Sequence, residues 1–175
     1  MSSSPEEALA RARNVRLAIF DVDGVMTDGT LYIGASGEAF KAFNILDGHG
    51  VKMLQSAGVA AAIISGRSSE AVAQRARELA IAHVVQGAAD KVAAFEALRA
   101  KLALAAEACA FVGDDLPDLD VMRRCGLAVA VAGAADDVKA AAHYVTRAGG
   151  GRGAVREFCE LVLRAQGRLG ASARG

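Results

Sequence analysis

The sequence predicts an α/β protein in three layers, α/β/α, with a doubly wound and mostly parallel sheet between two layers of helices. Short apolar runs alternate with helical patterns along the chain, which is typical of βαβ units. The apolar runs, among them AIF, VAAAII, ACAFV and LAVAV, are almost uninterrupted, as expected of strands covered on both faces. With 175 residues, of which 53% are hydrophobic, the chain can build one core. We expect residues 1–175 to form a single domain.

The order of the elements follows from these patterns. The expected strands are 16–21, 59–65, 82–86, 108–113, 127–130 and 143–145. The expected helices are 48–57, 68–79, 88–102, 117–123, 135–141 and 153–165. Ser68 is a suitable cap for the second of these helices. Residues 1–14 predict a tail with a short helix, and residues 167–175 predict a disordered tail.

Residues 29–44 break the alternation and predict a β-hairpin inserted after the first strand. LYI precedes a GASG turn, and EAFKAFN then alternates between polar and apolar residues. The apolar face of this hairpin would be exposed; it consists of Leu31, Ile33, Phe40 and Phe43. Because an exposed apolar patch of this kind usually has a partner, we expect the hairpin to mediate oligomerisation.

Composition excludes several classes of protein. Lys plus Arg and Asp plus Glu each number 20, so the formal charge is zero, and no basic stripe indicates nucleic-acid binding. No apolar stretch approaches the roughly 20 residues of a membrane span, and the N-terminus lacks a signal-peptide core. The three cysteines show no CxxC spacing, which argues against zinc or a disulfide framework. We expect reduced thiols in a cytoplasmic protein.

Polar motifs follow the expected strands. Residues 21–24 (DVDG) follow the first strand, 65–67 (SGR) the second and 113–115 (GDD) the fourth, while Lys91 lies near the start of the helix after the third. Ligands of doubly wound sheets bind beyond the carboxyl ends of the strands. The fold should therefore bring these motifs into one crevice.

The chemistry of these residues is that of phosphoryl transfer with a hard cation. Asp21 and Asp23 point to the same side of an extended chain, and Asp114 adds a carboxylate from a neighbouring strand. Oxygen ligands suit Mg²⁺, whereas the Ser65 hydroxyl and the Lys91 ammonium suit a phosphoryl group. A cation would allow a carboxylate to attack an anionic phosphate.

DVDGVMTDG, ISGR, Lys91 and GDDLPD resemble, in order, the four motifs of the haloacid dehalogenase superfamily of phosphohydrolases, over residues 16–157. The resemblance implies that superfamily's Rossmann-like fold. It implies that Asp21 is the nucleophile that forms an aspartyl-phosphate and that Asp23 is the general acid and then the general base. It further implies that Ser65 and Lys91 hold the phosphoryl oxygens. The Mg²⁺ ligands that it implies are the Asp21 carboxylate, the Asp23 main-chain carbonyl and Asp114, with Asp115 in support.

A closer resemblance follows from the gaps between motifs, which are too short for a cap domain. DGTLYIGASGE, NILDGHGVKML, ISGRSS and GGGRGAVRE are similar to the capless, tetrameric 3-deoxy-D-manno-octulosonate 8-phosphate phosphatases. This implies a cytoplasmic homotetramer in which four hairpins form a central barrel and a neighbour helps to close each site. The implied reaction supplies the sugar acid for lipopolysaccharide.

The resemblance also implies a set of substrate contacts. These are Asp23, Asn44, Ile45, Leu46, Asp47, Gly48, Lys52, Ser65, Gly66, Arg67, Arg75 and Lys91. Lys52 departs from the family, in which arginine is expected, and a lysine keeps the charge but loses the bidentate fork. Arg67 and Arg75 are eight residues apart on or beside one helix and could face a sugar-acid carboxylate together.

Alternatives remain at this stage. The substrate could be another sugar-acid phosphate, such as a sialic-type 9-phosphate, or the chain could be a phosphotransferase. It could also be a non-catalytic partner domain of a sugar-nucleotide synthetase, although the intact set of motif residues argues against that. Asp118 could support the metal or only the N-terminus of a helix. His49 could contact the substrate or have no role, and residues 149–153 could be a connector or a tail that folds over an active site.

Overall fold

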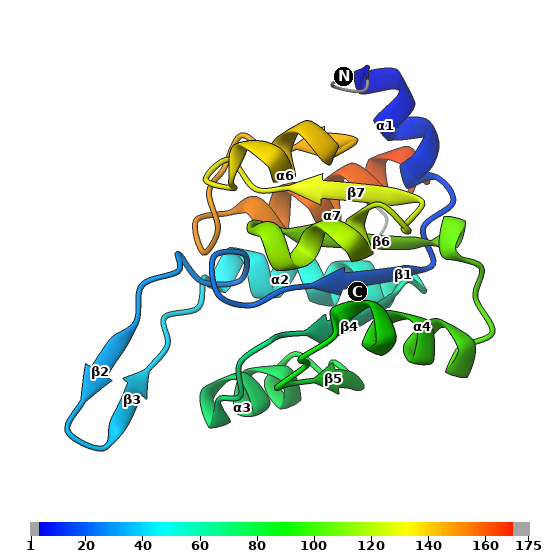
Figure 1. Cartoon of the computed structure of the whole chain (residues 1–175). Helices are drawn as coiled ribbons and strands as arrows, with labels where there is room; N and C mark the ends of the chain where they lie inside the picture. The colour runs from blue at the N-terminus through cyan, green and yellow to red at the C-terminus, as the bar shows by residue number, and fades with distance from the viewer. Residues whose placement is uncertain (1–3, 170–175) are drawn as a thin grey trace.

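The structure, a computed structural model, describes residues 4–169 and is built around a six-stranded sheet in which every neighbouring pair of strands is parallel (Figure 1). The strand order is β5-β4-β1-β6-β7-β8. The bounds are β1 Leu17–Phe20, β4 Ala60–Ile64, β5 His83–Val85, β6 Cys109–Gly113, β7 Leu127–Ala130 and β8 Tyr144–Val145. All six predicted strands are present, and the predicted doubly wound fold is confirmed.

Helices cover both faces of the sheet. Their bounds are α1 Pro5–Ala12, α2 Ile45–Ser56, α3 Glu70–Glu78, α4 Lys91–Lys101, α5 Leu119–Met122, α6 Asp136–Ala141 and α7 Ala154–Ala165, with short 3₁₀ turns at η1 Ala106–Ala108 and η2 Leu116–Asp118. Helices α1, α2, α3 and α7 pack on one face, and α4, α5 and α6 on the other (Figure 1). None of the helices within residues 4–169 is long and apolar enough to cross a membrane.

The sheet places the ends of its central strands at one edge. Strand β1 lies between β4 and β6, and Phe20 is in register with Ile63 on one side and Val112 on the other. The chain leaves β1 toward β4 and β5, then returns to β6 on the far side. This reversal produces the crevice in which ligands bind in folds of this type.

Several helix starts differ from the prediction; α4, for example, begins at Lys91 rather than Ala88. Helix α2 begins at Ile45 rather than near Gly48 because the Asn44 side chain accepts hydrogen bonds from the N–H groups of Leu46 (2.8 Å) and Asp47 (3.1 Å). The prediction that Ser68 caps the next helix is wrong. Ser69 occupies the N-cap position of α3, and its hydroxyl donates to Glu38 Oε1 at 2.6 Å.

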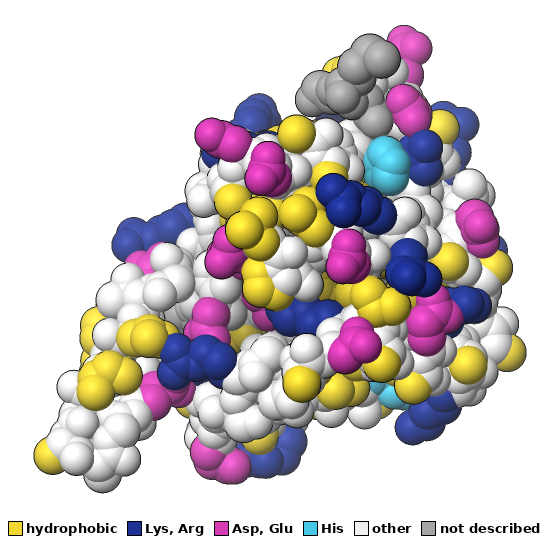
Figure 2. Space-filling model, in the orientation of Figure 1, with side chains coloured by type: hydrophobic (Ala, Val, Ile, Leu, Met, Phe, Trp, Pro, Cys, Tyr) yellow, Lys and Arg dark blue, Asp and Glu magenta, His cyan; other side chains and the backbone are white. Residues whose placement is uncertain are grey.

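The predicted hairpin is present as a separate two-stranded antiparallel sheet, β2 Tyr32–Gly34 and β3 Gly37–Phe40, which projects from the body of the molecule (Figure 1). Leu31, Ile33 and Phe40 are exposed, as predicted; Figure 2 shows hydrophobic side chains on the visible face of the hairpin. The prediction for Phe43 is wrong. It is half-buried against the core, with the Arg75 guanidinium 5.9 Å from its ring centroid.

The ends of the chain lie partly outside the described residues. The expected short N-terminal helix corresponds to α1, whereas residues 1–3 lie outside the described part. The predicted disordered tail, 167–175, falls mostly on residues 170–175, which also lie outside it. Arg168 donates its backbone N–H to the Leu163 carbonyl at 2.8 Å, so the beginning of that segment closes the end of α7.

The three cysteines are free and buried, as predicted.

Phe158 of α7 is expected to anchor the end of β1. It is fully buried and meets the ring of Phe20 edge to face, with centroids 5.7 Å apart, and Phe20 directly precedes Asp21. We expect Phe158→Ala to lower the free energy of unfolding by about 3–5 kcal/mol. Chemical denaturation measures this, with Val84→Ala at a partly exposed edge position as the matched control. Equal losses in the two variants would contradict the assignment of Phe158 to the core.

Candidate active site

A cleft of about 190 Å³ opens at the carboxyl ends of β1, β4 and β6, beside the start of α4. Its lining residues are Asp21, Asp23, Ser65, Gly66, Arg67, Lys91, Asp114, Asp115, Pro117 and Asp118. The structure therefore brings the four sequence motifs together in one place. The charged side chains in the cleft and beside it form two groups, which we call the inner and the outer cluster.

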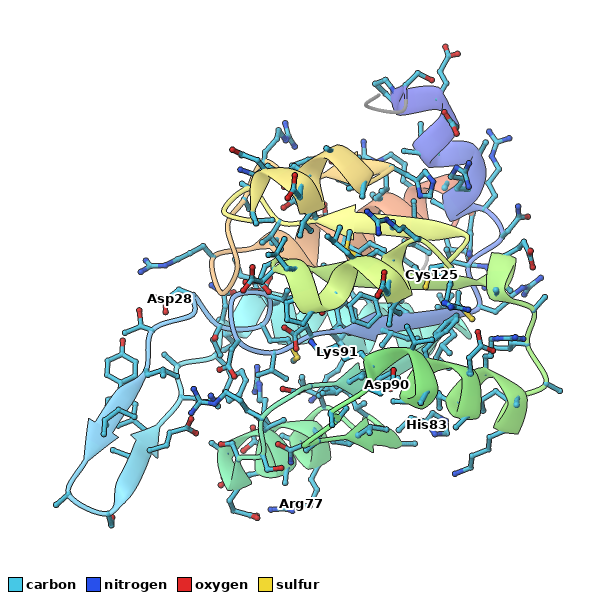
Figure 3. All side chains as sticks on the ribbon, in the orientation of Figure 1. Asp28, Arg77, His83, Asp90, Lys91 and Cys125 are labelled. Carbon is cyan, nitrogen blue, oxygen red and sulfur yellow. The ribbon has the colours of Figure 1, made fainter. Side chains whose placement is uncertain are left out.

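The inner cluster consists of Asp21, Lys91, Asp114 and Asp118. Lys91 Nζ lies 3.0 Å from Asp21 Oδ1 and 2.7 Å from Asp118 Oδ1. It projects from the first residue of α4 into the space between this helix and the sheet (Figure 3). Oxygens of the three carboxylates lie within 4.8 Å of one another. One ammonium, paired with two of these carboxylates, thus lies beside three, which leaves a formal charge of −2 when all four groups are ionised.

Burial and this excess of negative charge together change the pKa values. Burial, followed by repulsion from Asp118, raises the pKa of Asp21 to about 6 despite the attraction of Lys91. Burial, followed by repulsion from Asp21 and Asp118, raises the pKa of Asp114 to about 7. Burial alone would lower the pKa of Lys91, but the carboxylates of Asp21 and Asp118 outweigh it and raise that pKa. A divalent cation would counteract both causes, because it stabilises the charged form of each carboxylate.

The inner cluster fits a hard divalent cation. Its donors are oxygens, and Asp114 Oδ1 is buried without a hydrogen-bond partner among the described residues. Gly24 leaves room for this carboxylate, since a Cβ at that position would lie 2.0 Å from Asp114 Oδ2, and its φ of +90° favours glycine in any case. An acidic, all-oxygen site with an unpaired buried oxygen is what Mg²⁺ requires.

Asp118 is the site residue that the sequence left ambiguous. It is 1% exposed, and besides binding Lys91 its Oδ2 accepts the backbone N–H groups of Asp114 (3.0 Å) and Asp115 (3.4 Å). It therefore fixes both the lysine and the loop that carries Asp114. The GDDLPD spacing was the available signal. A turn that begins a 3₁₀ helix gives the same pattern, so the sequence alone could not separate the two roles.

The outer cluster consists of Asp23, Lys41, Glu38, Arg67 and Ser69. Asp23 Oδ1 lies 2.5 Å from Lys41 Nζ, and Asp23 Oδ2 lies 3.8 Å from Arg67 Nε. Glu38 Oε2 receives both Lys41 (2.9 Å) and Arg67 Nη2 (3.2 Å). Lys41 and Glu38 come from the hairpin and its return strand, and sequence reasoning missed both because it assigned this segment to β-alternation and oligomerisation.

Ser65 follows β4 and faces the same cleft as Lys91. It is buried, its backbone N–H donates to the Val85 carbonyl at 2.9 Å, and its hydroxyl oxygen lies 3.4 Å from the Arg67 N–H. The hydroxyl, the Lys91 ammonium and the carboxylate of Asp21 therefore line one small space. This arrangement is suited to a phosphoryl group.

The other predicted substrate contacts lie elsewhere in this chain. Asn44, Ile45, Leu46, Asp47, Gly48, Lys52 and Arg75 are not among the described residues that line the cleft. Asn44 caps α2, and Ile45 and Leu46 are 79% and 58% exposed. Arg75 binds Glu78 at 3.2 Å and packs over Gly48. These residues remain predicted contacts.

Asp47 instead holds the start of α7. Its Oδ1 accepts the Arg156 N–H at 2.9 Å and its Oδ2 the Gly153 N–H at 3.4 Å. Burial raises its pKa, and these backbone donors oppose the rise. The carboxylate is thus used inside the chain, at the contact between α2 and α7.

The glycine-rich segment 149–153 packs on the loop after Asp23. Gly151 N–H donates to the Val25 carbonyl at 2.9 Å, and Arg152 lies 3.4 Å from Asp28. A Cβ at Gly150 would lie 1.7 Å from the Gly24 carbonyl oxygen, so only glycine fits. Within this chain the segment is a connector that packs against the loop after Asp23, and its folding over a neighbour's active site stays a prediction.

The chain is similar to known proteins along most of its length. Residues 81–155 match the model of the haloacid dehalogenase-like hydrolases. The chain is 50% identical over 163 residues to the 3-deoxy-D-manno-octulosonate 8-phosphate phosphatase KdsC of Escherichia coli K12, covering 93% of this chain and 87% of that protein. The chain belongs to the 3-deoxy-D-manno-octulosonate 8-phosphate phosphatases.

Solved structures of 3-deoxy-D-manno-octulosonate 8-phosphate phosphatases have the same fold. The enzyme of Yersinia pestis has a TM-score of 0.92 and 49% identity over 94% of this chain and 89% of that one. The enzyme of Moraxella catarrhalis, solved with a magnesium ion, a phosphate ion and a KDO molecule, has a TM-score of 0.93 and 42% identity over 95% of each chain. The predicted family, fold and magnesium cofactor are thereby confirmed.

In this phosphatase, the charge on Asp114 should destabilise the metal-free fold. Its pKa rises from 3.8 to about 7 on folding, so the folded state binds more protons than the unfolded state between those values. Stability therefore falls as pH rises through that window. We expect Asp114→Asn to raise the Tm of the EDTA-treated protein at about pH 8, where 1 kcal/mol corresponds to about 2–4 °C, and to raise it clearly less at about pH 5, where only part of the loss has developed.

Thermal unfolding at the two pH values measures this effect. Asp120→Asn, at an exposed carboxylate, is the matched control and should change the Tm little at either pH. Added Mg²⁺ should raise the Tm of the wild-type protein more than that of Asp114→Asn. A stabilisation by Asp114→Asn that is independent of pH would contradict the assignment.

Proposed function

We propose that the chain hydrolyses 3-deoxy-D-manno-octulosonate 8-phosphate to the free sugar acid and inorganic phosphate, with Mg²⁺ and through an aspartyl-phosphate on Asp21. The observation that carries this proposal is the inner cluster, in which Lys91 and two further aspartates surround Asp21 at the cleft. Burying charged carboxylates costs free energy, and a protein that only binds a partner would not need such a group. The proposal extends to this chain the reaction for which its relatives are named.

The residues supply the two proton-transfer steps and the nucleophile. Asp21 attacks phosphorus, the bond from phosphorus to the ester oxygen breaks, and its electron pair stays on that oxygen. Asp23 supplies the proton that the leaving oxygen needs. Asp23 then takes a proton from water, which attacks the aspartyl-phosphate and releases phosphate. Lys91, held by Asp118, keeps Asp21 in place and with Ser65 faces the phosphoryl oxygens.

The carboxylates of Asp21 and Asp114 and the main-chain carbonyl of Asp23 would hold the Mg²⁺, with Asp115 in support. When bound, the ion would offset the negative charge of the carboxylates and of the phosphate, so that nucleophile and substrate can meet. Asp118 belongs to the same group of oxygens, but its contacts with Lys91 and the Asp114 loop favour a supporting role.

Recognition of the sugar acid requires a cation at the mouth of the cleft. Arg67 is suited to this because its side chain is 45% exposed while its guanidinium borders Asp23. A guanidinium binds a carboxylate through two parallel hydrogen bonds. Gly66, beside it, leaves the approach to the phosphoryl space open.

We infer that the enzyme is a cytoplasmic homotetramer that supplies the sugar acid for lipopolysaccharide. The projecting hairpin supports the oligomer because it exposes Leu31, Ile33 and Phe40 together. A neighbour's surface would also bring Ile45 and Leu46, which are exposed next to the predicted substrate segment, out of water. Asn44, Gly48, Lys52 and Arg75 would then approach the substrate only in the assembled enzyme.

Phosphate release across a panel of sugar phosphates tests the function. The panel contains 3-deoxy-D-manno-octulosonate 8-phosphate and sialic-type 9-phosphates, each with Mg²⁺ and with EDTA. We expect Mg²⁺-dependent turnover with a preference for the octulosonate. A preference for a 9-phosphate would show that the substrate is a sialic-type sugar acid. Transfer of the phosphoryl group to added alcohols would indicate a phosphotransferase. Inactivity on every ester would favour the partner-domain alternative.

Removal of the nucleophile and removal of the proton donor should differ in effect. We expect Asp21→Asn to abolish turnover and Asp23→Asn to lower kcat by about 10²–10⁴-fold. Steady-state kinetics measure both losses, and circular dichroism checks that both variants fold. Wild-type rates in Asp21→Asn would remove the proposed intermediate.

The oligomer should depend on the apolar face of the hairpin. Ile33 is 65% exposed, so Ile33→Asp should leave the subunit folded but reduce the mass in solution, because a charge buried at an interface is costly. Light scattering after gel filtration measures this mass, with Val84→Asp on the edge strand as the control. A wild-type protein that is monomeric at micromolar concentration would exclude the tetramer.

A further inference from the structure

We propose that Lys41 is a positioning residue, which holds the Asp23 carboxylate in the orientation needed for proton transfer and thereby couples the hairpin to catalysis. The inference rests on the proposed function, since it assumes that Asp23 is the general acid and base. It assigns to the hairpin a role inside its own subunit, separate from any contact between subunits.

The geometry fixes one oxygen of Asp23 and leaves a cation facing the other. Oδ1 faces Lys41 Nζ at 2.5 Å and Oδ2 faces Arg67 Nε at 3.8 Å. The Lys41 side chain is 3% exposed, whereas that of Asp23 is 22% exposed and borders the cleft. A buried ammonium thus holds the inner side of a carboxylate whose outer side remains open to the substrate. An ordinary surface lysine would instead keep its ammonium group in water.

Asp23 needs such a holder because of its neighbours. It lies two residues from Asp21, and the inner cluster, with a formal charge of −2 before a cation binds, repels another carboxylate. Once a cation offsets that charge, the phosphate of the substrate brings negative charge of its own. Without a cation on its far side, the side chain would be expected to turn toward solvent. A general acid must lie within hydrogen-bond reach of the leaving oxygen, and a displacement of about 1 Å can cost about 10²-fold in rate.

Lys41 is itself fixed by Glu38. Glu38 Oε2 lies 2.9 Å from Lys41 Nζ and 3.2 Å from Arg67 Nη2, and Oε1 accepts the Ser69 hydroxyl. The Ser69 hydroxyl and then the Lys41 ammonium hold the pKa of Glu38 below its usual range. Two cations and two carboxylates, Lys41 and Arg67 with Asp23 and Glu38, leave no net formal charge. The outer cluster therefore joins the hairpin, the loop after β1 and the loop after β4 without adding to the charge of the site.

The dependence of the rate on the leaving group tests this role. A sugar alkoxide is a poor leaving group and needs the proton from Asp23, whereas p-nitrophenolate needs little protonation. Because Asp23 also activates water in the second step, the first step is measured alone, as release of the alcohol in a single turnover. We expect Lys41→Met to lower this rate by about 10–100-fold on the octulosonate 8-phosphate but by less than about threefold on p-nitrophenyl phosphate, with little change in KM. Lys41→Arg should restore part of kcat, and Lys139→Met, at a lysine on α6 away from the cleft, is the control.

A double-mutant cycle separates positioning from a general effect on the fold. In the Asp23→Asn background, Lys41→Met should lower kcat no further, because the group that it positions is already absent. Glu38→Gln, which loosens Lys41, should show a weaker form of the same dependence on the leaving group. Thermal unfolding of each variant checks that it is folded.

Three results would overturn the inference. These are equal losses on both esters, multiplicative losses in the double variant, or a Lys41→Met enzyme with wild-type kinetics. Each presupposes a wild-type enzyme that is active and loses activity in Asp21→Asn. A wild-type protein inactive on every phosphate ester would instead remove the proposed function, and the inference with it.

Discussion

The ionic contact of Lys91 with Asp21 and Asp118 is the constraint on which the rest of the site depends. Two buried carboxylates compete for one ammonium at 3.0 and 2.7 Å, and Asp114 adds a third charge that none of the described side chains neutralises. Such a group is costly to bury, and the raised pKa values of Asp21 and Asp114 express that cost. A divalent cation lowers this cost by offsetting the negative charge. The site is therefore suited to an ion that the proposed chemistry also requires.

The sheet and the hairpin position different residues of the site. Parallel register brings the ends of β1, β4 and β6 to one edge, which places the nucleophile, the Ser65 hydroxyl and Asp114. The hairpin leaves β1 after Asp23 and returns with Lys41 against that same aspartate. The charged inner cluster and the neutral outer cluster are thus adjacent but distinct, with Asp21 in one and Asp23 in the other. Two carboxylates only two residues apart can therefore have different roles.

The sequence predicted the fold and most of the cleft because both follow from short-range patterns. Apolar runs identify strands, parallel pairing brings their ends together, and the motif residues Asp21, Ser65 and Asp114 lie just beyond those ends. The side chains that were missed, or that make contacts other than those predicted, depend on long-range packing. Lys41 reaches Asp23 only because the hairpin folds back, and the Asp47 carboxylate turns to the start of α7 because α2 packs on that helix. Periodicity carries no information about either contact.

The charge of the inner cluster can be measured through the protons that Mg²⁺ displaces. Calorimetric titration of the metal-free protein, in two buffers of different ionisation enthalpy, gives the number of protons released for each ion bound. With pKa values of about 6 for Asp21 and about 7 for Asp114, binding at about pH 6 should release at least about one proton, and binding at about pH 8.5 close to none. Proton release that does not change with pH, or no proton release at about pH 6, would contradict the view that the crowded carboxylates of the inner cluster form the binding site of the cation.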